Sequence, residues 1–469
     1  MKRKSIAMSA AETAGQPPEN KMGYLPIPKL LMTISLPMMA SMLVLSLYNI
    51  VDSVFVGMVS ENALAAVSLA FPMQILVIAV GTGTGVGVNA VLSRALGERN
   101  FRRANKAAMN GILLALFSSA LFVVIGLTCV KPFFASQTAN ADPEIYVYGV
   151  QYLSTLCVFS AAVFIQTIFE RLLQSTGKAF FTMITQTTGA VINIILDPFF
   201  IFGIGFFPRL EVLGAAVATV CGQVIAAGLA LFFNLRFNTE LTLRLRELKP
   251  DRALIGAIYR VGFPSIIMSA VGSVMNYGMN LILMGFSSTA AVVFGVYYKL
   301  QSFIFMPVFG LNGGVVPIVA YNYGAGRRRR IYATLKLSVI VAECLMAVGV
   351  FLFMVFPEPL LKLFSASDAL LAMGVPALRI ISTHFLIAGV CIIIGSVFQG
   401  LGNGVYSLIV SVMRQLVVLL PAAFLLAQFF GLAALWWAFP LAELMSFAVS
   451  SVCFFRIKRK ILDHIPDKA

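Results

Sequence analysis

Charged residues are scarce in this 469-residue chain, where Asp, Glu, Lys and Arg together make up only 11% of the sequence. Hydrophobic residues make up 59%, and the mean hydropathy is +0.93. These values exclude a soluble globular protein, and the length excludes a single membrane span. The sequence therefore predicts an all-α polytopic membrane protein.

Histidine is also rare, and the cysteines are not paired in short motifs. Only two histidines are present, which argues against a metal centre built from imidazoles. The six cysteines lie in apolar segments without a Cys-x-x-Cys motif, so we expect small hydrophobic thiols and no cofactor. The N-terminal stretch lacks the apolar core of a cleaved signal peptide, and we expect residues 1–29 to be a short disordered cytoplasmic tail.

Apolar windows of about 20 residues, each long enough to cross a bilayer, recur twelve times. The predicted spans cover residues 30–57, 63–92, 105–130, 146–171, 180–203, 212–235, 254–285, 290–321, 332–356, 376–400, 405–429 and 432–455. Several are longer than a bilayer requires, so we expect tilted or kinked helices.

Lys and Arg are distributed unevenly between the connecting segments. With a cytoplasmic N-terminus, the inside segments hold 26 of the 34 Lys and Arg residues and the outside segments hold 3. This bias predicts that both termini are cytoplasmic in a bacterial inner membrane. It also accounts for the net charge of +15 without nucleic acid, and it makes the run 327–330 primarily a determinant of orientation.

The two halves of the chain resemble each other. Leu36-Pro37 matches Phe263-Pro264, and Asn49 matches Asn276, each pair being 227 residues apart. Because six spans are an even number, the halves have the same orientation. Parallel repeats with a cavity between them are typical of transporters. The predicted parts are a tail (1–29), an N-lobe (30–235), a cytoplasmic linker (236–253), a C-lobe (254–456) and a second tail (457–469).

An aspartate lies within the fifth predicted span, which contains no Lys or Arg near it. Placing such an acid at membrane depth costs roughly 2.5–3.5 kcal/mol, so it is usually retained for an ion, a proton or a charged ligand. Asn193 precedes Asp197 by four residues and shares its helical face, while Pro198 weakens the helix beside the acid. The alternative is a carboxylate that is hydrogen-bonded to a neighbouring helix for structure.

A second acid, Asp52, lies in the first span, three residues after Asn49. In the second half its counterpart is Met279, and the counterpart of Asp197 is Leu420, so both acids belong to the N-lobe only. Counting from the cytoplasmic ends places both in the outer half of the membrane. Two such carboxylates close together would share a proton.

Other polar residues in the spans can be explained by structural pairing or by helix packing. Glu343 and Glu443 are expected to pair with a basic group such as Arg414. The remaining ionisable residues of these spans are Lys299, Arg379 and His384. They either line a cavity or pack in the core or against lipid. The glycine-rich run 81–87 does not follow a strand, so it indicates close helix packing and not nucleotide binding.

Several motifs in order resemble one known family. They are Tyr48-Asn-Ile-Val-Asp52-Ser-Val-Phe-Val-Gly57, Asn193-Ile-Ile-Leu-Asp197-Pro198, the stretch from Lys299 to Asn312, and Tyr321-Asn-Tyr-Gly324. Together they resemble the multidrug and toxic compound extrusion (MATE) transporters, with the greatest likeness to MepA-type exporters.

This resemblance implies twelve transmembrane helices in two pseudo-symmetric six-helix lobes around a V-shaped cavity. It implies antiport, in which organic, often cationic, compounds leave the cell in exchange for H⁺ or Na⁺. The predicted coupling residues are Asp52, Asn193, Asp197, Asn49 and Thr219. If the coupling ion is Na⁺, it would contact Asp52, Asn193 and Asp197. The predicted drug contacts are Tyr48, Gln174, Asn276, Tyr277, Gln301 and Met306.

Two alternatives remain open from the sequence. A flippase for a lipid-linked or amphipathic substrate would need cations in the cavity, for which Lys299 and Arg379 are the candidates. A membrane enzyme would need a nucleophile, a base and oxyanion donors, and no motif assembles them. The sequence does not choose between Na⁺ and H⁺, and a monomer is the working expectation.

Overall fold

The computed structural model describes residues 20–138, 142–205, 207–243, 248–364 and 367–467. Within these residues the chain forms helices joined by short connections, without a β-sheet. The helices of the first half are α2 (Lys21–Tyr24), α3 (Ile27–Gly57), α4 (Glu61–Gly97), α5 (Phe101–Thr128), α6 (Val130–Gln137), α7 (Pro143–Val158), α8 (Ala161–Ser175), α9 (Ala179–Phe202) and α10 (Val212–Phe237).

The second half repeats this arrangement. Its helices are α11 (Arg252–Phe286), α12 (Ser288–Ala325), α13 (Arg328–Val355), α14 (Pro357–Lys362), α15 (Asp368–Ser382), α16 (Phe385–Gly400), α17 (Gly404–Val412), the π-helix η2 (Met413–Leu419), α18 (Leu420–Phe430), α19 (Leu432–Leu435), α20 (Ala438–Lys460) and the 3₁₀ turn η3 (Leu462–His464).

The prediction of twelve spans is confirmed within the described residues. Ten segments are long and apolar enough to cross a membrane singly. The other two are bent pairs, α7 with α8 at 45° and α15 with α16 at 47°. Each bend lies in the fourth span of its half, so the two halves also share the position of this bend.

Local sequence explains where many of these helices begin. The side chains of Ser60, Asn100 and Ser287 each accept a hydrogen bond from the backbone N–H three residues later. Asp251 caps α11 in the same way through the N–H groups of residues 253 and 254. Such caps satisfy donors that have no partner inside the helix, which matters where water is scarce.

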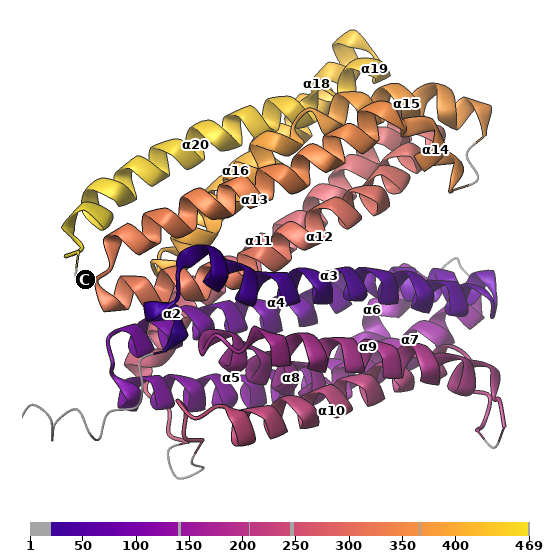
Figure 1. Cartoon of the computed structure of the whole chain (residues 1–469). Helices are drawn as coiled ribbons and strands as arrows, with labels where there is room; N and C mark the ends of the chain where they lie inside the picture. The colour runs from indigo at the N-terminus through magenta and orange to yellow at the C-terminus, as the bar shows by residue number, and fades with distance from the viewer. Residues whose placement is uncertain (1–19, 139–141, 206, 244–247, 365–366, 468–469) are drawn as a thin grey trace, which may run out of the picture.

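The helices form two lobes that meet at one end and diverge toward the other (Figure 1). The N-lobe holds α3 to α10, and the C-lobe holds α11 to α20. Contacts between the lobes come mainly from α11 against α4 and from α12 against α3 and α4. The end where the lobes meet also holds α2 and the C-terminal end of α20, and the lobes separate with distance from this end.

Glycines permit the close contact between the lobes. A Cβ atom on Gly87 of α4 would lie 2.2 Å from the backbone oxygen of Ile258 on α11. A Cβ on Gly97 would lie 2.0 Å from the backbone oxygen of Tyr321, and one on Gly324 would lie 2.2 Å from that of Arg94. Gly97 and Gly324 are 227 residues apart, which is the spacing of the repeat, and each packs against the helix that carries the other. The glycine run of α4 therefore serves helix packing, as its sequence predicts.

The residues before the first span differ in part from the prediction of a disordered tail. Residues 1–19 lie outside the described residues, but the chain forms helix α2 and then enters α3 at Ile27. Arg330 donates hydrogen bonds to the backbone oxygens of Met22 and Leu25 at 2.9 and 2.8 Å, and Arg327 donates to Gly23 at 2.7 Å. The basic run 327–330 therefore also fastens the N-terminal segment to the C-lobe.

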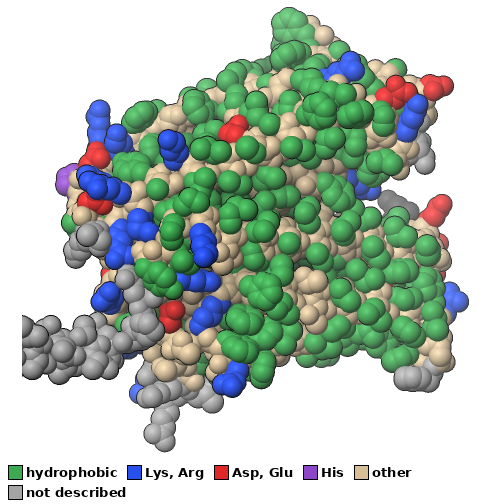
Figure 2. All heavy atoms as spheres, viewed as in Figure 1, with side chains coloured by type: hydrophobic (Ala, Val, Ile, Leu, Met, Phe, Trp, Pro, Cys, Tyr) green, Lys and Arg blue, Asp and Glu red, His purple; other side chains and the backbone are tan. Residues whose placement is uncertain are grey.

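The surface matches a membrane protein. Lys and Arg side chains gather at the end where the lobes meet, and apolar side chains cover most of the face between the two ends (Figure 2). The outward-facing apolar side chains include Phe117, Leu127 and Leu235, which are 65, 67 and 65% exposed. Exposed apolar surface of this extent is stable in lipid and not in water.

We expect Gly87→Leu to destabilise the protein by disrupting the contact between α4 and α11. The nearest atom to the new Cβ is a backbone oxygen, which no side-chain rotation moves away, so the cost is about 1–3 kcal/mol or more. Thermal unfolding of the purified protein in detergent measures this loss. Gly228→Leu in α10 is the matched control, because nothing lies within 4 Å of a Cβ there. Equal unfolding temperatures for both variants would contradict the proposed packing role.

Candidate functional site

Two buried carboxylates form the centre of a polar cluster inside the N-lobe. Asp52 on α3 is 9% exposed, and Asp197 on α9 is fully buried. Helix α3 packs against α9, and the two carboxylates are near enough to interact electrostatically. The structure therefore brings together the two acids that the sequence singled out.

Neutral polar side chains surround the two acids. The Asn193 amide donates to the Thr219 hydroxyl over 3.1 Å, which joins α9 to α10. The phenol of Tyr48 lies beside Thr219 and interacts electrostatically with both acids. Tyr48, predicted as a drug contact, thus belongs to this cluster and does not line the cavity described below.

Four carboxylate and amide oxygens of the cluster have no hydrogen-bond donors among the described residues. This holds for Oδ1 of Asp52, Oδ1 of Asn193 and both carboxylate oxygens of Asp197, all of which are buried. Within the described part of the chain, no Lys or Arg nitrogen lies within 4.0 Å of Asp52 or Asp197. Buried oxygens without donors are costly, and a proton or a small cation would satisfy them.

The number and type of possible ligands in this cluster limit which ions it can bind. No group of three or more His, Cys, Asp or Glu residues that could hold a metal occurs among the described residues. Two carboxylates with an amide and a hydroxyl supply only oxygen ligands and at most two negative charges. Such a set fits a proton or a hard monovalent cation better than a transition metal.

Asn49, which was predicted as a coupling residue, lies outside the cluster. Its side chain is exposed, and its backbone oxygen accepts a hydrogen bond from Ser53 over 2.8 Å. Residues three apart are separated by about 60° around a helix. That angle is wide enough to place Asp52 inside the lobe and Asn49 on its surface.

Two further polar residues, which were not predicted from the sequence, belong to this region. Tyr152 on α7 interacts electrostatically with both acids, and its hydroxyl accepts a hydrogen bond from Gln74 on α4 at 2.8 Å. Both are polar residues at membrane depth, which is the signal that singled out the aspartates. Tyrosine and glutamine give a weaker signal than a charge, because they are less costly in a membrane.

Glu170 on α8 shows what a satisfied buried acid looks like in the same lobe. Its carboxylate accepts hydrogen bonds from Gln166, Thr185 and Gln186 at 2.9, 3.0 and 2.8 Å. Three donors stabilise the charge without an ion. We therefore interpret Glu170 as a structural acid, in contrast to Asp52 and Asp197, which lack such donors among the described residues.

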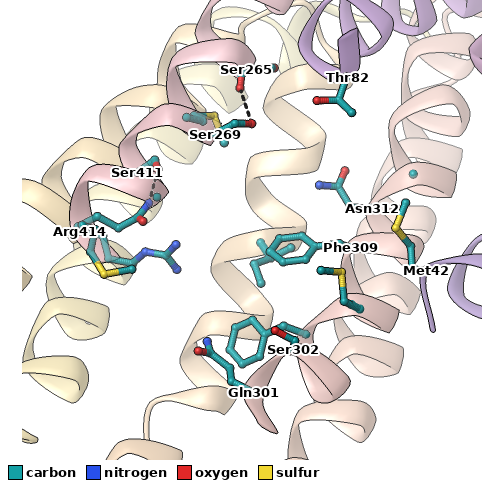
Figure 3. Close-up of a pocket in the computed structure, with 18 of the residues that line it drawn as sticks. Met42, Thr82, Ser265, Ser269, Gln301, Ser302, Phe309, Asn312, Ser411 and Arg414 are labelled. Atoms are coloured by element: carbon teal, nitrogen blue, oxygen red, sulfur yellow. Dashed lines mark hydrogen bonds between the residues drawn. The ribbon is translucent and has the colours of Figure 1, made fainter. Parts of the chain in front are cut away.

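A cavity of about 440 Å³ lies between the lobes. The N-lobe contributes Met42 and Thr82, and the C-lobe contributes most of the remaining wall, including Gln301, Phe309 and Asn312 (Figure 3). Five methionines and six Phe or Tyr residues lie in this wall, with polar side chains between them. This size and lining suit a drug-sized amphipathic molecule.

The structure places the predicted drug contacts in different environments. Gln301 and Met306 line the cavity. Gln174 is buried and accepts a hydrogen bond from Arg171 over 2.8 Å, so it lies behind the wall. Asn276 and Tyr277 do not line the cavity, and Tyr277 is 67% exposed.

The charged groups of the cavity wall differ from those that the sequence suggested. Lys299 and Arg379 do not line it. Their nitrogens instead contact the Phe364 ring and the Met354 backbone oxygen, respectively. Arg171 on α8 does line the cavity.

The expected pairing of Glu443 with Arg414 is observed, at 3.3 Å, and both residues line the cavity. His384, at the bend between α15 and α16, also lines it, with Nδ1 3.8 Å from the same carboxylate. Glu343 was also expected to pair with a basic group, but no such ion pair is found among the described residues. Its buried Oε1 has no hydrogen-bond partner there.

Comparison with known proteins decides the family. The MatE family model matches residues 37–199 and 264–425, once in each lobe. The chain belongs to the MatE family. This assignment agrees with the two-lobe repeat and with the MATE resemblance of the motifs.

Individual MATE relatives match along nearly the whole chain. Multidrug export protein MepA of Staphylococcus haemolyticus is 27% identical over 92% of this chain and 94% of its own length. The FAD transporter of Shewanella oneidensis is 26% identical over 92% of this chain and 95% of its own length. A solved outward-facing structure of a multidrug resistance MATE transporter is 24% identical, covers 95% of this chain and all of its own, and has a TM-score of 0.88, which shows the shared fold.

We expect Asp197→Asn to raise the thermal stability of the protein. The substitution keeps the shape of the side chain but removes a buried charge that has no donor, and the gain is on the order of 1 kcal/mol. Thermal unfolding in detergent without added Na⁺ measures it. The matched control is Glu170→Gln, which removes a charge that three donors stabilise and should lower stability. A loss of stability in both variants would show that Asp197 is a structural acid.

Proposed function

We propose that this MATE-family transporter is a secondary active multidrug efflux antiporter. It exports organic, often cationic, compounds in exchange for H⁺ or Na⁺, and it is not an enzyme. The observation that carries the proposal is the pair of buried acids, Asp52 and Asp197, whose oxygens have no donors and no basic partner among the described residues.

The position of this pair supports a coupling role. The acids lie on α3 and α9, and α3 also contributes Met38 and Met42 to the cavity wall. A change in the charge of the cluster therefore acts on a helix that contacts the transported compound. Ion binding and drug binding to one helix are coupled when each favours a different arrangement of that helix.

We infer that the end where the lobes meet is cytoplasmic. Lys and Arg are concentrated there, and the positive-inside rule assigns such an end to the cytoplasm. The lobes then diverge toward the outside of the cell, and the structure corresponds to an outward-facing state.

In the proposed cycle, a cation or proton from outside binds Asp52 and Asp197 in this state. Neutralising the acids changes the packing of α3 and weakens the hold on the drug, which leaves to the outside. The lobes then close outside and open inside, where the lower ion activity empties the cluster. A new drug molecule binds from the cytoplasm, and the protein returns.

The flippase alternative receives some support, because Arg171 and Arg414 place cations in the cavity where the sequence offered only Lys299 and Arg379. Such cations suit a phosphate headgroup. The cavity volume of about 440 Å³ favours a drug-sized molecule over a two-chain lipid. Efflux of a small soluble dye distinguishes the two functions.

We expect Asp52→Asn and Asp197→Asn each to reduce ethidium efflux from energised cells by at least about tenfold, because an amide cannot bind and release a proton or pair with a cation. Dye fluorescence measures efflux, with surface expression checked for every variant. If wild-type efflux requires Na⁺, then Na⁺ is the coupling ion, and efflux that depends on the proton gradient alone identifies H⁺.

Glu170→Gln serves as the matched control, since it removes a buried acid from the same lobe that has its own donors. Its efflux should stay close to that of the wild type at equal expression. Normal efflux in both aspartate variants would refute the coupling role of the cluster.

A further inference from the structure

The charges that line the cavity indicate which compounds it accepts. Among the described residues, the wall holds two arginines and one glutamate, and one histidine lies beside the glutamate. The arginines come from different lobes, Arg171 from α8 and Arg414 from η2. Two arginines against one glutamate give the wall a net positive charge in either protonation state of the histidine.

The glutamate contributes little negative charge to a ligand in the cavity. The Glu443 side chain is only 3% exposed, and its Oε2 lies 3.3 Å from Nη1 of Arg414 and 3.8 Å from Nδ1 of His384. Its charge is therefore directed at groups of the wall itself. A cationic compound in the cavity would meet a carboxylate that already has a cation beside it.

Arg414 keeps most of its donors for the cavity. Its side chain is 28% exposed, and only Nη1 contacts Glu443, whereas a guanidinium carries five N–H groups. Figure 3 shows the side chain extending from its helix toward the space in front of Gln301 and Phe309. The helix is a π-helix at this point, a feature that often marks functional sites in α-helices.

Arg171 on the opposite lobe lacks an acidic partner within 4.0 Å among the described residues. Its Nη1 donates to the neutral Oε1 of Gln174 at 2.8 Å. The adjacent Glu170 is engaged by donors from α8 and α9 and forms no ion pair with it. Glu170 is near enough to interact electrostatically with Arg171, but only Nη1 of the guanidinium donates a hydrogen bond among the described residues. The remaining donors of Arg171 can therefore bind an anionic group in the cavity.

We propose that Arg171 and Arg414 make the cavity a binding site for amphipathic organic anions and zwitterions that carry a carboxylate. This inference rests on the proposed efflux function and deepens it by naming the compounds that the cavity binds most tightly, whereas a cation without a carboxylate, such as ethidium, binds more weakly. The guanidinium matches a carboxylate geometrically and binds it with charged hydrogen bonds. The methionine and aromatic side chains of the wall bind the apolar body of the same molecule.

A matched pair of dyes tests the proposal directly. A rhodamine with a free carboxylate is a zwitterion, and its methyl ester is a cation of nearly the same shape. We expect the wild-type protein in lipid nanodiscs to bind the free acid at least about tenfold more tightly than the ester. Fluorescence anisotropy measures both affinities at one pH and without an ion gradient.

Substitutions then assign the preference to the arginines. The double variant Arg414→Gln/Glu443→Gln removes the pair without leaving a buried charge alone, and it should lose most of the preference for the acid. Arg171→Gln should reduce the preference as well. Glu443→Gln alone should increase it, because it removes the carboxylate that competes for Arg414, whereas a purely structural role would weaken the binding of both dyes.

Arg379→Gln is the control, since it removes an arginine from a spanning helix of the same lobe that does not line the cavity. This variant should keep the wild-type preference. Tighter binding of the ester by the wild type, or an unchanged preference in the double variant, would overturn the proposal. Because the assay needs no ion gradient, a failure of the antiport proposal would not affect its outcome.

Discussion

The architecture depends on the backbone contact between the lobes at one end of the molecule. There α4 meets α11 and α12 so closely that Gly87, Gly97 and Gly324 leave no room for a Cβ. Hydrophobic burial gives helices in lipid little reason to associate, so close packing between small residues must supply much of the attraction. Because this contact is confined to one end, the lobes separate toward the other, and the cavity occupies the space between them.

The membrane also explains the contrast between the buried acids. Glu170 has three donors, and Glu443 has Arg414 beside it. Asp52 and Asp197 have neither among the described residues, although burial is costly for an unpaired carboxylate. The protein thus keeps two unpaired carboxyl groups together in one cluster, where a bound ion or proton would stabilise them. Sites of this kind lower stability in return for function.

The two lobes have diverged in what they offer to the cavity. The N-lobe carries the acid cluster behind its wall, while the C-lobe supplies most of the wall and the group formed by His384, Arg414 and Glu443. The shared bend in the fourth span places His384 at the cavity, and the π-helix η2 presents Arg414 there. One ancestral arrangement therefore holds different chemistry in each half.

The sequence by itself determined the number of spans, the repeat and the presence of Asp52 and Asp197 at membrane depth, because hydropathy and an acid in an apolar span are local signals. It did not determine which face of a helix points inward. Only the tertiary structure placed Asn49 on the surface, brought Tyr152 to the acids and turned Arg171 into the cavity. These outcomes depend on the rotation and spacing of neighbouring helices, which packing between distant residues decides and no single span encodes.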